Sequence, residues 1–332
     1  MKVKERRKRA GGDRNGEASK GGEVRKRHKR GAMKLEPNAR IAFQGERGAF
    51  SEEAAVKLLG GGVVLIPRAT FEALFTAVDE DAADYLLAPI ENSLAGSVHR
   101  TYDLLVESRL SIIAEEIIPI VHCLIGLPHA TLGHITTVES HPVALAQCEE
   151  FFRERPHLKR IATEDTAGSV RIIMEAGDPR RAGIASRRAA EIYGATILRE
   201  HLEDNSENFT RFLLLGPASK TSDAANKLSL VFQTAHQPGA LFHALGPFAR
   251  RGINLMKLES RPIAGRPWEY RFYLDLQASP YEPEAAAAIE ELERLSVNLR
   301  ILGSYISAEI AGAPERPNHF READYGMRGT HK

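Results

Sequence analysis

Short apolar runs alternate with amphipathic stretches along most of this chain. Residues 40–44 form the first run, which leads through a glycine turn into an Ala-rich stretch ending near Leu59. Further apolar runs end near Glu139, Glu164 and Ala185, and each is followed by Ser or Asp and an amphipathic stretch. Ser and Asp favour the position before a helix. Alternating strands and helices predict an α/β architecture with largely parallel sheets.

The last third of the chain has a different pattern. Residues 216–223 are rich in Gly, Pro, Ser and Thr and predict a linker. The periodicity after it predicts a β-α-β-β-α-β unit of the ferredoxin-like type. Its strands are expected at 227–234, 253–260, 268–276 and 299–307, and its helices at 239–250 and 283–295.

Charge is distributed unevenly along the chain. Residues 1–32 hold 13 Lys and Arg against 4 Asp and Glu, whereas the other 300 residues hold 32 basic and 40 acidic ones. We interpret the basic segment as a disordered extension. An arm that touches nucleic acid is the alternative, but no aromatic residues interleave the charges for stacking. The acidic remainder predicts no nucleic-acid partner.

The cysteines and the longest apolar run exclude further classes. Cys123 and Cys148 have no metal-site spacing and form no disulfide framework, which is typical of a reducing cytoplasm. Residues 117–127 are interrupted by Pro119 and His122 and are too short to span a bilayer. We therefore expect a cytoplasmic protein with no membrane partner.

No motif for a nucleotide, metal or other cofactor is present. The turn that contains Gly45 and Gly48 lacks the third glycine of a dinucleotide fingerprint. His122 and His141 are isolated, so we assign them no chemistry. In α/β sheets, however, ligands collect where strands end and helices begin, since free N–H groups point outward there. Several such junctions predict an anion site that needs no cofactor.

The segment 207–212 is the centre of the predicted site. It places the hydroxyl of Thr210 beside the guanidinium of Arg211, with Phe on either side, just before an apolar strand. Arg matches a carboxylate with two parallel hydrogen bonds, and Thr can donate to a second group of the same ligand. In the alternative interpretation the Phe residues belong to the core and the Thr–Arg pair merely ends a strand.

Seven segments, in order, resemble the monofunctional bacterial prephenate dehydratases. They are residues 45–52, 91–98, 140–148, 165–169, 208–212, 239–241 and 259–262. Val143 and the pair 46–47 depart from the usual family pattern. No stretch before residue 40 is expected to supply the chorismate mutase domain of some relatives.

The resemblance implies a two-lobed catalytic domain like a type II periplasmic binding protein, followed by a ferredoxin-like βαββαβ ACT regulatory domain. The implied divisions are a disordered extension (1–39), the catalytic domain (40–217, with lobes at about 40–115 plus 195–217 and at 116–194), a linker (218–225), the ACT domain (226–310) and a disordered tail (311–332).

The implied function is the conversion of prephenate to phenylpyruvate in L-phenylalanine biosynthesis, with feedback by phenylalanine through the ACT domain. Neither a cofactor nor a metal is expected, and the implied assembly is a homodimer or homotetramer. An arogenate dehydratase and a non-enzymatic amino-acid sensor on the same fold remain alternatives.

The resemblance also implies roles for particular residues. Thr210 and Arg211 are expected to be catalytic. The residues expected to bind substrate are Gly45, Ser51, Glu91, Asn92, Ser93, Thr166, Ala167, Ser169, Asn208 and Phe212. Those expected to bind phenylalanine are Gly239, Ala240, Leu241, Asn254, Leu255, Glu259, Ser260, Arg261 and Pro262.

Overall fold

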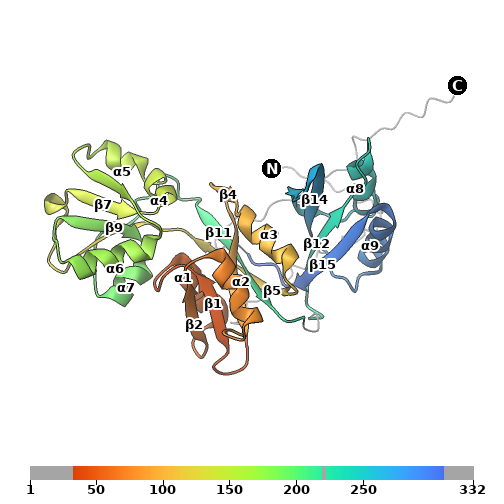
Figure 1. Cartoon of the computed structure of the whole chain (residues 1–332), viewed down its shortest axis with the longest axis horizontal. Coiled ribbons are helices and arrows are strands. Elements are labelled where there is room, and N and C mark those ends of the chain that lie inside the picture. Colours follow the sequence, from red (N-terminus) through yellow and green to blue (C-terminus); the bar gives the residue numbers. More distant parts are fainter. Residues whose placement is uncertain (1–32, 219–221, 310–332) are drawn as a thin grey trace, which may run out of the picture. The chain divides into compact units, whose positions relative to one another are not determined.

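The computed structural model describes residues 33–218 and 222–309, which build three β-sheets with helices against them (Figure 1). The expected extension at 1–32 and the tail at 311–332 lie outside the described residues. Strands and helices alternate along the first two sheets, as the sequence pattern predicts, so the α/β prediction is confirmed. The expectation of largely parallel sheets is wrong, because both sheets mix parallel and antiparallel strand pairs.

The first sheet is built from two segments of the chain that are far apart in sequence. Its strands are β1 (Arg40–Gln44), β2 (Val64–Arg68), β3 (Tyr85–Asn92), β4 (Gly96–Ser97), β5 (Ser111–Pro119) and β11 (Phe209–Gly216). Their order is β2-β1-β3-β11-β5, with β4 paired to β3. The late strand β11 therefore lies antiparallel between β3 and β5.

Three helices pack on the two faces of this sheet. They are α1 (Phe50–Leu59), α2 (Phe71–Asp79) and α3 (His99–Glu107). On one face, called the α1 face, Leu58 shares a core cluster with Phe212 and Leu214 of β11. On the other, the α3 face, Leu105 shares a cluster with Leu213. The two faces of β11 thus belong to different cores.

The second sheet is formed by the chain between β5 and β11. Its strands are β6 (Cys123–Gly126), β7 (Thr137–Ser140), β8 (Lys159–Ala162), β9 (Arg181–Ala185) and β10 (Thr196–Arg199), in the order β10-β6-β9-β7-β8. Its helices are η1 (Leu132–His134), α4 (Pro142–Ala146), α5 (Glu149–Arg153), α6 (Thr166–Ala176) and α7 (Arg187–Tyr193). In Figure 1, α4 and α5 lie on one side of this sheet and α6 and α7 on the other.

Two of the three expected helix caps in this sheet are confirmed, whereas α4 is capped by His141 instead of Ser140, whose hydroxyl donates to the Ile184 carbonyl. The Asp165 carboxylate accepts a hydrogen bond of 2.6 Å from the backbone N–H of Gly168 at the start of α6. The Ser186 hydroxyl does the same for Ala189 at the start of α7 (3.1 Å). These side chains satisfy donors that a helix leaves free in its first turn.

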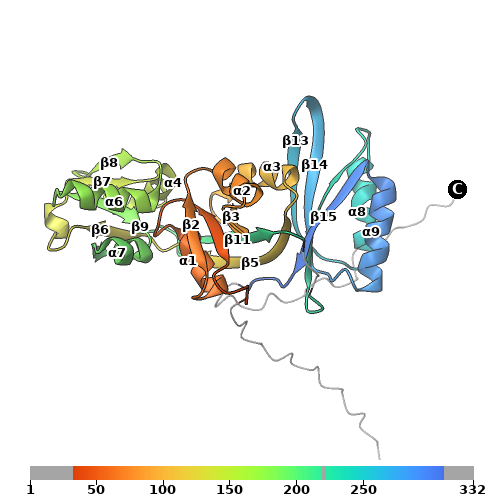
Figure 2. The ribbon, with the colours of Figure 1, turned by 60° about the horizontal axis from the view of Figure 1, so that its bottom comes forward.

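The third sheet has the predicted β-α-β-β-α-β order. Its elements are β12 (Lys227–Gln233), α8 (Ala240–Arg250), β13 (Leu255–Ile263), β14 (Arg266–Leu276), α9 (Pro283–Leu295) and β15 (Asn298–Tyr305), and the strand order is β13-β14-β12-β15. Figure 2 shows α8 and α9 side by side on one face. On the other face, Val231 and Leu302 belong to the same core cluster as Leu105 of α3.

Candidate functional site

A row of polar side chains leads from Thr210 on β11 to a histidine between the first and second sheets. Asn92 Nδ2 lies 2.9 Å from Thr210 Oγ1 and 2.7 Å from Asn208 Oδ1. Asn208 Nδ2 lies 3.0 Å from Gln147 Oε1, which in turn lies 2.9 Å from His122 Nε2. We call these five residues the amide chain. It connects β3 and β11 to the C-cap of α4 in the second sheet.

The backbone fixes which way the Asn92 amide points. Asn92 Oδ1 accepts from the backbone N–H groups of Leu94 (3.0 Å) and Ala95 (2.7 Å). Because a backbone N–H can only donate, the oxygen must face it and Nδ2 must face Thr210. The Thr210 hydroxyl therefore accepts from Asn92 and keeps its own proton for another acceptor. This leaves a hydrogen-bond donor at the site.

Arg211 does not lie beside the Thr210 hydroxyl, as we expected from the sequence. The strand β11 begins at Phe209, so the motif lies within the strand rather than before it. Successive side chains of a strand point to opposite faces. Thr210 shares the α1 face with Phe212, whereas Arg211 lies on the α3 face with Leu213.

Arg211 belongs to a buried group of charges that we call the charge cluster: Arg211, Glu115, Lys227 and Asp275. Arg211 Nη1 lies 2.6 Å from Asp275 Oδ2 and 3.3 Å from Glu115 Oε2. Lys227 Nζ lies 2.8 Å from Glu115 Oε2. Two members come from the first sheet and two from the third, so the cluster joins the two sheets.

The cluster holds Arg211 and Asp275 in their charged forms. Burial opposes the charge on Arg211, but Asp275 and Glu115 outweigh it and the pKa of Arg211 lies well above its ordinary value. Burial likewise opposes the charge on Asp275, yet Arg211, Lys227 and a hydrogen bond from Ser229 hold its pKa below the ordinary value. Mutual pairing thus compensates the loss of water around these groups.

The remaining expected substrate residues on β3 divide between the two faces in the same way. Glu91 pairs with Arg211 across the strands and Asn92 with Thr210. The Glu91 carboxylate lies 3.6 Å from Arg211 and 2.8 Å from Lys257 of β13, so the structure turns it toward the third sheet. Ser93 Oγ donates to the Glu207 carbonyl (2.7 Å) and fixes the start of β11.

A second group of expected substrate residues gathers where the first glycine turn meets the start of α6. Gly45 has φ +102°, and a Cβ there would lie 3.0 Å from the Asp165 carboxylate, so any other residue would be strained and crowded. Ala167 and Ser169 are buried in the first turn, and Ser169 Oγ donates to the Thr166 carbonyl (2.6 Å). Backbone N–H groups of this helix start remain suited to a carboxylate.

Two further expected substrate residues lie in well-packed surroundings. Ser51 is buried in the first turn of α1. Phe212 is 2% exposed and belongs to the core on the α1 face, together with Leu214 and Ile118. The ring of Phe212 thus helps to fix the strand that carries Thr210.

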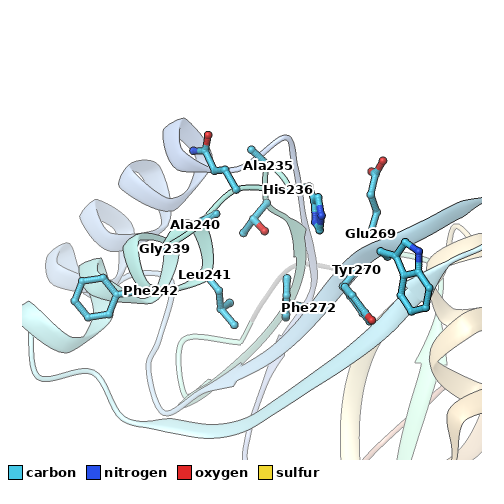
Figure 3. Close-up of a pocket in the computed structure, with 12 residues that line it drawn as sticks. Ala235, His236, Gly239, Ala240, Leu241, Phe242, Glu269, Tyr270 and Phe272 are labelled. Carbon is cyan, nitrogen blue, oxygen red and sulfur yellow. The ribbon is translucent and has the colours of Figure 1, made fainter.

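The effector residues expected in the third sheet fall into two sets. Gly239, Ala240 and Leu241 line a pocket at the start of α8, together with Tyr270 and Phe272 of β14 (Figure 3). Figure 3 also shows His236 and Glu269 at this pocket. A glycine with φ +79° before the helix lets the backbone approach a ligand closely.

The expected residues on β13 do not line this pocket. Glu259 accepts from Ser97 Oγ (2.6 Å), and Arg261 Nη2 lies 2.8 Å from the Asp103 carboxylate of α3. These two side chains therefore contact the first sheet and its helix. Ser260 and Pro262 are exposed, and they pair in register with Phe272 and Tyr270 of the pocket.

Asn254 and Leu255, at the start of this strand, are also expected effector residues that lie outside the pocket lining. Asn254 Nδ2 donates to Gln277 Oε1 (3.1 Å), and Leu255 packs against the core beneath α8 and α9. Both contacts hold β13 to the rest of the third sheet.

Sequence reasoning missed Gln147, His122 and Asp275. Each interrupts an otherwise apolar segment, which is a signal for a buried polar contact. Their partners are distant in sequence, however, and no local pattern identifies them.

Within residues 33–218 and 222–309, no group of three or more His, Cys, Asp or Glu side chains is arranged to hold a metal ion. None of the helices in these ranges is both long and apolar enough to cross a membrane.

The fold and this site define a two-sheet α/β enzyme with a ferredoxin-like C-terminal unit. Residues 41–220 match the family model described as prephenate dehydratase. The chain therefore belongs to the prephenate dehydratase family and is a carbon–oxygen lyase of aromatic amino-acid biosynthesis.

One relative and one solved structure carry names that agree with this assignment, and a third similar protein is described by another activity. Arogenate dehydratase/prephenate dehydratase 1 of Arabidopsis thaliana, a chloroplastic protein, is 41% identical over 282 residues, which are 80% of this chain and 71% of the relative. The prephenate dehydratase of Arthrobacter aurescens, solved in complex with L-Phe, is 32% identical with a TM-score of 0.75, over 81% of this chain and 90% of that one. GqqA, described as a novel type of quorum-quenching acylase, is 35% identical with a TM-score of 0.75, over 81% and 98% of the two chains.

Proposed function

We propose that this chain is a prephenate dehydratase that forms phenylpyruvate for L-phenylalanine biosynthesis. Prephenate carries a carboxylate and a hydroxyl at opposite positions of its ring. The bond to the ring carboxylate breaks and its electron pair moves through the ring, which expels the hydroxyl. With one proton, the products are carbon dioxide, water and phenylpyruvate. Aromatisation drives the reaction, so the protein must mainly orient the substrate and assist the departing oxygen.

The observation that carries this proposal is the direction of the hydrogen bond between Asn92 and Thr210. Since Asn92 donates to Thr210 Oγ1, the Thr210 proton is available to the departing hydroxyl. A Thr hydroxyl is a weak acid, so it stabilises the developing hydroxide by a hydrogen bond rather than by full proton transfer. Thr210 is thus the catalytic residue of the proposal.

We assign the two carboxylates of the substrate to donors on the second sheet and the glycine turn. The start of α6, with Thr166 and Ala167, offers backbone N–H groups and the Thr166 hydroxyl next to Gly45. The buried Ser169 hydroxyl supports this turn by donating to the Thr166 carbonyl. Arg211 acts differently from our first expectation. Its ion pairs with Asp275 and Glu115 hold it on the far face of β11, so we propose that it positions the strand.

We propose that the third sheet is an ACT regulatory domain that binds phenylalanine at the pocket of Gly239, Ala240 and Leu241. The support is the L-Phe complex of the Arthrobacter aurescens relative and the close backbone approach at this helix start. Phe242 and Trp268 at the pocket are 75% and 76% exposed. Such rings fit a contact with a second copy of the chain, so we propose a homodimer or homotetramer.

The proposed feedback has a physical route to the catalytic strand. On β13, Glu259 and Arg261 contact β4 and α3, and Lys257 pairs with Glu91 beside Arg211. A shift of β13 on binding phenylalanine would therefore change the partners of β11. Phenylalanine then inhibits by favouring a less active arrangement.

Arogenate is the second candidate substrate, because the Arabidopsis relative carries both activities in its name. The two substrates differ in having an amino or a keto group on the side chain. Comparing kcat/KM of the full chain for prephenate and arogenate decides between them. The proposal predicts a higher value for prephenate and inhibition of that turnover by phenylalanine. A higher value for arogenate would make the chain an arogenate dehydratase, and no turnover of either would leave an amino-acid sensor.

A further inference from the structure

His122 is held rigidly where the chain crosses from β5 into the second sheet. Its backbone N–H donates to Glu203 Oε2 (2.8 Å), and its carbonyl accepts from the Leu202 N–H (3.0 Å). These partners lie on the segment that returns to β11. The imidazole, 2% exposed, stands edge-on to Phe50 of α1 with ring centroids 5.7 Å apart. The ring is therefore fixed by contacts outside the amide chain.

The hydrogen bonds of the amide chain, followed from Asn92 to His122, determine which nitrogen of the imidazole is protonated. Asn92 donates, so the Asn208 atom that faces it is the carbonyl oxygen and the Asn208 amide nitrogen faces Gln147. The Gln147 atom that accepts from Asn208 is then its oxygen, and His122 Nε2 must carry the hydrogen it shares with that oxygen. Burial also lowers the pKa of His122, in agreement with a neutral ring.

The other ring nitrogen shows that stability alone does not explain a histidine here. His122 Nδ1 is buried and has no hydrogen-bond partner among the described residues. A bare acceptor in the interior is unfavourable, and a Phe side chain would avoid it. What the imidazole provides is a rigid N–H donor directed at Gln147.

That donor matters because the Asn92 amide has more acceptors than hydrogens. Its two hydrogens face Thr210 Oγ1 (2.9 Å), Asn208 Oδ1 (2.7 Å) and the Phe209 carbonyl (3.1 Å). Asn92 Oδ1 stays held by Leu94 and Ala95, so if Asn208 moves, the Asn92 amide tilts about that oxygen toward the Phe209 carbonyl, which shifts its hydrogen bond to Thr210. The position of Asn208 is set by Gln147, which His122 holds.

We propose that His122 is a positioning residue of the dehydratase reaction. Its Nε2–H fixes Gln147 and, through Asn208, the Asn92 amide that directs the Thr210 proton toward the substrate. This inference rests on the proposed function, since it assigns Thr210 as the donor to the departing hydroxyl.

The test compares two substitutions at this position in the full chain. His122→Phe keeps a ring against Phe50 but removes the donor, whereas His122→Gln keeps an N–H near the position of Nε2. Val138→Ala, in the buried core of the second sheet, is the control for a loss of stability. We expect His122→Phe to lower kcat for the preferred substrate by about 10- to 100-fold with KM within about threefold, because misplacing a group by about 1 Å has effects of this size.

The His122→Gln and Val138→Ala variants distinguish a positioning role of His122 from a role in stability alone. His122→Gln is expected to recover about tenfold in kcat over His122→Phe, and Val138→Ala to keep kcat despite a lower Tm. Two results would overturn this inference but not the proposed function. One is a His122→Phe variant whose kcat stays within about twofold of wild type, and the other is a Val138→Ala variant whose kcat falls as far as that of His122→Phe. A wild-type chain inactive on both prephenate and arogenate would overturn the proposed function and this inference with it.

A second measurement applies if His122→Phe does not fold. The ¹⁵N chemical shifts of the His122 imidazole in the wild-type chain, assigned by their loss in His122→Gln, report the tautomer. A protonated Nε2 with a bare Nδ1 supports the inference. A ring protonated on Nδ1 would reverse the hydrogen bond to Gln147 and contradict it.

Discussion

The two faces of β11 differ in the kind of interaction they contain. On the Thr210 side the amide chain consists of a hydroxyl, three amides and a neutral imidazole. On the Arg211 side, one residue further along, lie the four charges of the charge cluster. Because its neighbours are neutral, the Thr210 hydroxyl keeps its proton. The paired charges on the other face instead connect the first sheet to the third. Two neighbouring residues of β11 thus have different proposed roles: Thr210 in catalysis and Arg211 in holding the strand.

The two groups also connect different parts of the molecule. The amide chain draws on the first and second sheets, and the charge cluster on the first and third. We therefore infer that changes on the Thr210 side act on turnover and changes on the Arg211 side act on stability and on the response to phenylalanine. Four substitutions, one control substitution and one pH experiment test this separation.

Thr210→Val should have the largest effect. The substitution keeps the shape and removes the hydroxyl, so kcat should fall by about 10²- to 10³-fold, as for the loss of a hydrogen-bond donor that stabilises a developing oxyanion. Thr210→Ser, which keeps the hydroxyl, should retain most of the activity. A Val variant with kcat within about tenfold of wild type would refute the role of Thr210.

Asn92→Asp tests the direction of the hydrogen bond to Thr210. The introduced carboxylate keeps the acceptor for Leu94 and Ala95 but replaces the donor, so the Thr210 proton would turn toward that carboxylate and away from the substrate. We expect kcat to fall about 100-fold, comparable to removing one donor that stabilises an oxyanion. Steady-state kinetics at about pH 7 measures this, and an unchanged kcat would contradict the assigned direction.

Asp275→Asn should act mainly on stability and feedback. Removing one carboxylate leaves Arg211 and Lys227 to share Glu115, and breaking a buried pair in this way costs about 3–5 kcal/mol. Denaturant unfolding measures this loss. The phenylalanine concentration for half-inhibition should rise about tenfold, while kcat of the folded protein stays within about threefold of wild type.

The same carboxylate predicts a pH dependence of stability. The pKa of Asp275 in the folded chain lies below its ordinary value of 3.8, so its contribution is present above pH 3.8 and is lost as the pH falls through the folded pKa. Urea unfolding between about pH 2 and 5 should show a steeper acid loss for wild type than for Asp275→Asn. Equal slopes would show that the Asp275 carboxylate is not stabilised by the cluster.

Asp103→Asn should have the smallest effect. Its ion pair with Arg261 is partly exposed, so the free energy of unfolding should change by about 1 kcal/mol or less. Half-inhibition by phenylalanine should shift upward by about two- to fivefold without a change in kcat, because the pair links β13 to α3. An unaltered half-inhibition would show that the Asp103–Arg261 pair does not couple the phenylalanine pocket to β11.

Much of this arrangement could be predicted from local sequence. The helix caps at Asp165 and Ser186 and the β-α-β-β-α-β unit follow from propensity and periodicity, and both are present. Asn92, Asn208 and Thr210 were expected in one site and lie together. Helix caps and the order of strands and helices depend on residues close in sequence, so the sequence pattern is enough to predict them.

The division between the two faces could not be predicted. The apolar run at 213–215 suggested a strand that starts after the motif, and β11 instead begins at Phe209. If the start of the strand is placed after Phe212, Thr210 and Arg211 lie outside it, and the alternation that puts them on opposite faces cannot be predicted. The charges of Glu115 and Lys227 are visible within apolar strands, but their pairing across 112 positions depends on the packing of two sheets.

The most direct test measures kcat and inhibition by phenylalanine in parallel for Thr210→Val and Asp275→Asn. We predict that Thr210→Val loses turnover but binds phenylalanine with wild-type affinity by calorimetry. Asp275→Asn should keep turnover and lose most of its inhibition. If Asp275→Asn loses turnover as severely as Thr210→Val while remaining folded, the two faces of β11 act as one site and the separation is wrong.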